Sequence, residues 1–121
     1  MKIILIFILS FLCHSSSLAG EADVLAVDVK KNSGNTYNFS VTVAHNDANW
    51  DHFANKWEII AIDETILATR VLQHPHVNEQ PFTRSLSGVK LPDGTESVTI
   101  RAHDSVHKYG GKVVTVKLPK K

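Results

Sequence analysis

Alternation of apolar and polar residues is the feature that most constrains this chain, because it recurs along most of its length. The stretch YNFSVTV at residues 37–43 places an apolar side chain at every second position, and VTIRAH at residues 98–103 does the same. Successive side chains of a β-strand point to opposite faces, so this period predicts half-buried strands. No stretch has the 3.6-residue period of an amphipathic helix. The pattern therefore predicts an all-β protein.

Seven strands are expected, separated by turn-forming residues. Their predicted ranges are 24–30, 36–45, 56–62, 66–73, 85–91, 98–103 and 112–118. Trp57 lies on the third strand, where it would pack between two sheets. Seven short strands with this tryptophan predict a seven-stranded immunoglobulin-like or fibronectin III-like antiparallel sandwich, and a small barrel is the alternative.

The first nineteen residues have the character of a secretory signal peptide. Lys2 precedes an apolar run at residues 3–12, broken only by Ser10, and Ser17 and Ala19 supply the small residues of a cleavage site. An uncleaved anchor is the alternative, although the run is short for a membrane span. We therefore expect a signal peptide at residues 1–19 and a single domain at residues 20–121, which acts in the periplasm or outside the cell.

Composition excludes several kinds of site from the mature domain. Cleavage after Ala19 would remove Cys13, the only cysteine of the sequence. Without a thiolate the domain can hold no blue-copper centre and no iron–sulfur cluster, and it cannot exchange disulfides. The formal net charge of +1 gives no bias toward nucleic acid or an anionic membrane. We expect no nucleic-acid partner and no membrane span in the mature domain.

The histidines are expected to gather at one end of the sandwich. Alternate connections of an up-and-down sandwich share a pole, and this places the three long connections, residues 46–55, 74–84 and 104–111, together. Apart from His14 in the leader, every histidine lies in one of these connections or at a strand end that leads into one. Long loops of unusual composition on a rigid scaffold are common places for function.

Histidine is a common protein ligand of zinc and copper, so these loops predict a metal site for one of the two ions. His74 and His76 flank Pro75 in an extended segment, so both rings can point the same way. Acidic side chains nearby would bind the ion or accept hydrogen bonds from the imidazoles. The expected ligands are His52, His74, His76, His103 and His107, and the acidic side chains are Asp51, Glu79 and Asp104.

A structural role is the alternative for each histidine, because imidazole can satisfy buried backbone groups in a long loop. We expect this role for His45, which ends the inward-facing series of the second strand. Glu79 and Arg84 favour an ion pair that closes their loop, with Phe82 inserted in the top of the core, over a catalytic role.

An interaction or adhesion module is the second function that these loops could serve. Trp50, Phe53 and Tyr109 could form an aromatic rim that contacts a protein or a glycan, and the histidines would then be structural. No serine or cysteine nucleophile has a recognisable setting. Enzyme activity would therefore require chemistry assisted by a metal ion, and we favour a protein that is not an enzyme.

Three stretches carry a resemblance: NWDHFANKWEII, LQHPHVNEQPFTRSLSGV and VTIRAHDSVHKYGG. Together they resemble a family of small, uncharacterised bacterial proteins that are secreted or periplasmic. The His-Pro-His-Val stretch with its following Glu-Gln-Pro-Phe-Thr-Arg is the most distinctive element. The resemblance covers most of the mature chain. It implies an extracytoplasmic β-sandwich, and it implies no particular activity.

Overall fold

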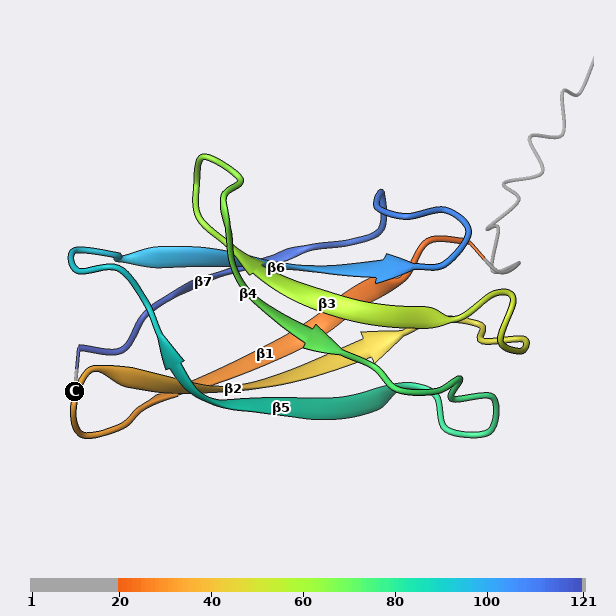
Figure 1. The fold of residues 1–121 in the computed structure, drawn as a ribbon, viewed down its shortest axis with the longest axis horizontal. Helices are drawn as coiled ribbons and strands as arrows, with labels where there is room; N and C mark the ends of the chain where they lie inside the picture. The colour runs from red at the N-terminus through yellow and green to blue at the C-terminus, as the bar shows by residue number, and fades with distance from the viewer. Residues whose placement is uncertain (1–19, 121) are drawn as a thin grey trace, which may run out of the picture.

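The computed structural model describes residues 20–120, which form seven antiparallel strands and no helix (Figure 1). No helix in this range could therefore cross a membrane. The expected signal segment, residues 1–19, lies outside the described residues. The strands are β1 Asp23–Lys31, β2 Thr36–Ala44, β3 Ala54–Ile60, β4 Ile66–Val71, β5 Phe82–Lys90, β6 Ser97–Asp104 and β7 Val114–Lys117.

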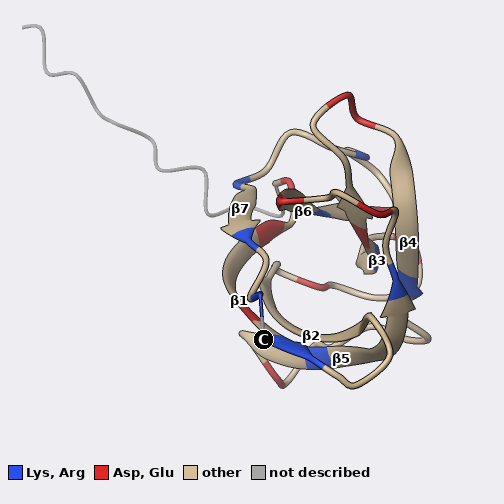
Figure 2. Ribbon diagram, turned by 90° about the vertical axis from the view of Figure 1, so that its left-hand side faces the viewer, with Lys and Arg blue, Asp and Glu red and all other residues tan. Residues whose placement is uncertain are grey.

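The strands form two sheets packed face to face. One sheet has the order β1-β2-β5 and the other has the order β4-β3-β6-β7. An end-on view shows the two layers enclosing the core, with acidic and basic segments interspersed around the ribbon (Figure 2). This arrangement confirms the predicted immunoglobulin-like, fibronectin III-like sandwich.

The core follows from the alternation of the strands. Phe39, Val41 and Val43 of β2 are fully buried between the sheets, while the residues between them face outward. Trp57 and Ile59 of β3 are equally buried on the opposite sheet. Because side chains along a strand alternate between its two faces, one face of each sheet supplies this core.

Several strand limits differ from the expected ones, and local contacts explain two of the differences. β5 begins at Phe82 rather than residue 85, because Phe82 pairs with Val43 and is 2% exposed. β3 ends at Ile60 because the chain turns there, with the Ala61 N–H donating to the Thr65 carbonyl. The expected insertion of Phe82 in the top of the core is confirmed.

The connections divide between two ends of the sandwich. The segments 45–53, 72–81 and 105–113 lie at one end, here called the histidine pole (Figure 1). The short connections 32–35, 61–65 and 91–96 lie at the other end, here called the turn pole. Gly20, the first described residue, is at the histidine pole and contacts His45. The expected gathering of the three long loops is therefore observed.

Candidate metal centre

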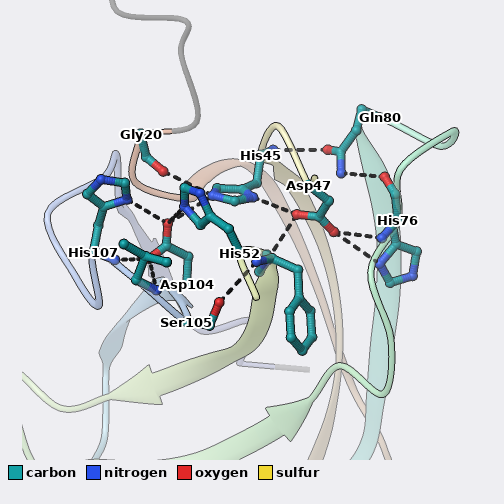
Figure 3. A network of polar contacts seen from close by, with 12 residues as sticks. Gly20, His45, Asp47, His52, His76, Gln80, Asp104, Ser105 and His107 are labelled. Atoms are coloured by element: carbon teal, nitrogen blue, oxygen red, sulfur yellow. Dashed lines mark hydrogen bonds and ion pairs between the residues drawn. The ribbon is translucent and has the colours of Figure 1, made fainter. Parts of the chain in front are cut away.

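Asp104 is the centre of the histidine pole. It ends β6, its side chain is fully buried, and its Oδ2 atom meets three imidazoles (Figure 3). His45 Nε2 lies 2.9 Å from this oxygen, His52 Nε2 lies 2.9 Å from it, and His107 Nδ1 lies 3.1 Å from it. One carboxylate oxygen at the end of β6 therefore joins the 45–53 loop, which follows β2, to the 105–113 loop.

The second oxygen of Asp104 organises the 105–113 loop. Asp104 Oδ1 accepts hydrogen bonds from the backbone N–H groups of Val106, His107 and Lys108. Burial opposes ionisation of this carboxyl, but the hydrogen bonds from His107 and His52 outweigh it, so the pKa of Asp104 lies well below its ordinary value. The carboxylate is therefore ionised at neutral pH.

His45 is held between two carboxylates. Its ring is fully buried, with Nδ1 2.5 Å from Asp47 Oδ1 and Nε2 2.9 Å from Asp104 Oδ2. Burial alone would lower the pKa of His45, but the contacts with Asp47 and Asp104 outweigh burial and raise it. Since a carboxylate can only accept, both ring nitrogens donate and the ring is an imidazolium. His45 therefore braces its loop, as expected, and its ring is also part of the candidate site.

Asp47 fixes the surrounding loops. Its Oδ1 accepts from the Ala54 N–H at 3.0 Å, and its Oδ2 accepts from the His76 N–H at 2.6 Å. Gln80 accepts from the His45 N–H and donates to the His76 carbonyl, both at 2.9 Å. Although burial opposes it, the His45 contact lowers the pKa of Asp47. The His-Pro-His loop is thus attached to the site through Asp47.

Within residues 20–120, one group of three side chains has the spacing of a metal site: His45, His52 and Asp104, whose ligand atoms all lie within 4.8 Å of one another. Tetrahedral ligands at 2.0–2.1 Å from zinc stand roughly 3.3 Å apart. The two nitrogens lie 2.9 Å from Asp104 Oδ2, which is close to this separation. His107 contacts the same oxygen and is more exposed.

His74 and His76 form a separate pair beside this group. Their ring centroids are 4.7 Å apart, and His76 stacks on Phe82 with centroids 3.9 Å apart. His76 Nε2 accepts from Arg84 at 2.9 Å, and Arg84 also forms the expected ion pair with Glu79 at 2.9 Å. Burial, and then the charge of Arg84, lower the pKa of His76. His76 is therefore neutral, with Nε2 engaged by Arg84.

His103 lies on the outer side of the four-stranded sheet. Its Nδ1 is 2.6 Å from Asn55 Oδ1, and its ring meets the edge of Tyr109. Burial, and then the charge of Lys56, lower the pKa of His103. Asp104, His45, His52 and His107 are here called the Asp104 group. The contacts of the His74, His76 and His103 rings lie outside this group, and ion binding by these three histidines stays a prediction.

The aromatic residues of the expected rim divide into two groups. Trp50 is 66% exposed and meets Phe53 edge-on at 5.7 Å. Tyr109 instead lies over the outer sheet face, where its hydroxyl donates to Glu58 at 2.8 Å. Burial, and then the Glu58 contact, raise the pKa of Tyr109. Trp50 and Phe53 therefore form the aromatic edge of the histidine pole.

Sequence reasoning singled out His52, His107 and Asp104 but did not consider Asp47. A signal for Asp47 exists, because it follows the inward-facing His45 by two residues. A carboxylate at that distance from a buried histidine can reach its ring. Asp51, the acid that was expected in this loop, is exposed, and its backbone carbonyl accepts a hydrogen bond from the Ser105 hydroxyl.

Comparisons with known proteins add one relative. No family model and no solved structure matches the chain. The chain is similar to a protein of Halomicrobium mukohataei named "Putative lipoprotein", with 38% identity over 96 residues. The matched residues make up 79% of this chain and 47% of that protein. The chain therefore spans about half the length of this curated relative.

Proposed function

We propose that this chain is an extracytoplasmic metal-binding protein that holds zinc or copper(II) at the histidine pole. The observation that carries the proposal is the convergence of three imidazole nitrogens on Asp104 Oδ2. The signal-like residues 1–19 and the naming of the relative as a lipoprotein support a place outside the cytoplasm.

The proposed ligands are His45 Nε2, His52 Nε2 and Asp104 Oδ2, with His107 Nδ1 as a further ligand from the exposed side. Imidazole and carboxylate donors suit both zinc and copper(II). The His52 side chain is 16% exposed and the His107 side chain is 38% exposed, so an ion can approach from their side. The buried residues then hold the ion from below.

Asp47 would orient His45 toward the ion. A ligating histidine commonly donates its other ring N–H to a carboxylate, which fixes the tautomer. Here His45 Nδ1 would keep its proton for Asp47, while Nε2 would lose its proton and bind the ion. Loading would therefore release protons, as expected when ligands must be deprotonated.

The test is metal binding by protein purified without a histidine tag. Zinc at 100 times the dissociation constant should raise the free energy of unfolding by about 2.7 kcal/mol. His52→Ala should lose this gain, since it removes a ligand. His74→Ala is the matched control, because it removes a histidine of the same pole that lies outside the Asp104 group. No metal in the native protein and no stabilisation by zinc or copper(II) would contradict the proposal.

A second candidate is an interaction module, favoured by the 66% exposure of Trp50 beside Phe53. Large exposed aromatic side chains are typical of surfaces that contact a protein or a glycan. In this case Trp50→Ala would abolish binding to a glycan array or to an envelope protein, while metal removal would leave that binding unchanged. Loss of binding on metal removal alone would favour the metal site.

A further inference from the structure

Gly20 lies against the candidate metal centre. Its carbonyl oxygen is 3.0 Å from His45 Nε2, the nitrogen that also faces Asp104 Oδ2 (Figure 3). A backbone oxygen is therefore already placed beside the proposed ligands. This matters because Gly20 follows the expected cleavage position after Ala19.

The segment that carries Gly20 is firmly held. Ala22 is buried, the Val24 N–H donates to the Lys112 carbonyl at 2.8 Å, and the Lys112 N–H donates to the Asp23 side chain at 2.7 Å. Gly111 packs so closely that an added Cβ atom would lie 2.0 Å from the Ala22 carbonyl oxygen. The 105–113 loop thus fixes the start of the domain at the rim of the site.

We propose that removal of residues 1–19 gives the metal centre an additional pair of ligands, the α-amino nitrogen and the carbonyl oxygen of Gly20. This inference rests on the proposed metal-binding function. The two atoms are separated by Cα and the carbonyl carbon, so both can bind one ion in a five-membered chelate ring. Glycine has no side chain to obstruct the approach.

Processing is needed because it changes the chemistry of the Gly20 nitrogen. In the uncleaved chain this nitrogen belongs to an amide, whose lone pair is delocalised into the carbonyl group. After cleavage it is an amine with an ordinary pKa near 7.7–8.0, from which an ion can displace the proton. Tight metal loading would therefore follow export and signal removal.

The experiment compares a chain that begins at Gly20 with one that retains Ala19 as a single additional residue. All seven strands and the buried core lie within residues 20–120, so both forms contain the complete sandwich. Zinc affinity is measured by competition with a chelator, and copper(II) coordination by electron paramagnetic resonance. We expect the form with Ala19 to bind zinc about 10-fold or more weakly. We also expect its copper(II) spectrum to show a changed nitrogen coordination.

The outcomes separate this inference from the proposed function. Equal zinc affinities and identical copper(II) spectra would overturn the role of Gly20 while the His45, His52 and Asp104 site stands. Failure of both forms to bind either ion would overturn the metal site itself, and the Gly20 inference with it. Acetylation of the Gly20 amine is the matched chemical control, because it should weaken binding without adding a residue.

Discussion

The two poles of the sandwich are built in different ways. The turn pole consists of short connections held by local contacts, such as the Thr95 N–H donating to the Pro92 carbonyl and the Asn32 side chain donating to Thr36. Gly34 and Gly94 adopt the positive φ angles of 83° and 82° that such turns require. The histidine pole has longer loops joined by buried side chains distant in sequence, including His45 and Asp104.

This difference suggests that the buried charged groups of the histidine pole serve a purpose other than stability. Burying ionised groups is costly unless each has a partner, so a network of this kind is not the simplest way to close a sandwich. The turn pole shows that the same strands can be connected without such groups. We infer that the buried charges of the histidine pole are retained for binding. Substitutions at each pole test this inference, beginning with the largest expected effect.

Replacement of Asp104 should give the largest effect. Asp104→Ala would leave the buried His45 imidazolium without one of its two carboxylates and remove the acceptor of the Val106 and His107 N–H groups, so we expect a loss of about 3–5 kcal/mol in the free energy of unfolding. The exposed Asp93 of the turn pole is the control, and Asp93→Ala should change this energy by no more than about 0.5 kcal/mol. Urea denaturation measures both, and equal losses would remove the distinction between the poles.

Asp47→Asn should have the next largest effect. The substitution keeps an acceptor for the Ala54 N–H but removes the charge beside His45, at an expected cost of about 2 kcal/mol. Asn32→Ala, which removes two side-chain hydrogen bonds near the turn pole, is the comparison and should cost roughly 1 kcal/mol. A larger loss for Asn32→Ala would contradict the account.

Acid should weaken the contacts of Asp47 and Asp104 at the histidine pole. The pKa values of Asp47 and Asp104 are lowered in the folded protein, so their stabilisation is present above the ordinary value of 3.8 and is lost as the pH falls through the folded values. We expect the metal-free protein to lose roughly 1–2 kcal/mol below about pH 4. Asp104→Asn should make the free energy of unfolding less dependent on pH in this range. An unchanged pH dependence in that variant would argue against a contribution from Asp104.

The contribution of His45 to the free energy of unfolding has the opposite pH dependence. Its pKa is raised, so its stabilisation is fully present below 6.5 and is lost as the pH rises through the folded value. His76 and His103 have lowered pKa values, so their contribution is lost as the pH falls below 6.5. The histidine contributions oppose one another near pH 6.5. The loss of stability below about pH 4 is therefore the clearer test of the carboxylate contacts.

Tyr109→Phe should have the smallest effect of this series. It removes the hydroxyl that donates to the buried Glu58, which keeps its contact with Arg101 at 3.0 Å. We expect a cost of about 1 kcal/mol in thermal or urea unfolding, with zinc affinity unchanged. A marked loss of zinc affinity would show that the outer face of the four-stranded sheet is coupled to the metal centre.

The fold could be predicted because its signal is local and repeated. The alternating residues of β2 and β6 identified both strands, and the turn residues separated them. Strand limits were less certain, because cross-strand contacts decide them. Phe82 extends β5 backward by pairing with Val43, and no local pattern marks that pairing.

The site could be predicted only in part. Topology placed the long loops together, so His52, His107 and Asp104 were expected at one pole, and their side chains do meet there. Sequence gives no side-chain direction within a loop, and this is why His45 was assigned only to bracing and Asp47 was overlooked. The partners of His76 and His103, Arg84 and Asn55, likewise depend on how the loops fold back on the sheets.

A crystal structure of the tag-free protein with zinc, using anomalous scattering at the zinc edge, tests the central claim most directly. The account predicts one zinc ion about 2.0–2.2 Å from His45 Nε2, His52 Nε2 and Asp104 Oδ2, with His45 Nδ1 still facing Asp47. Zinc bound elsewhere, or an unchanged His45–Asp104 hydrogen bond at saturating zinc, would contradict it.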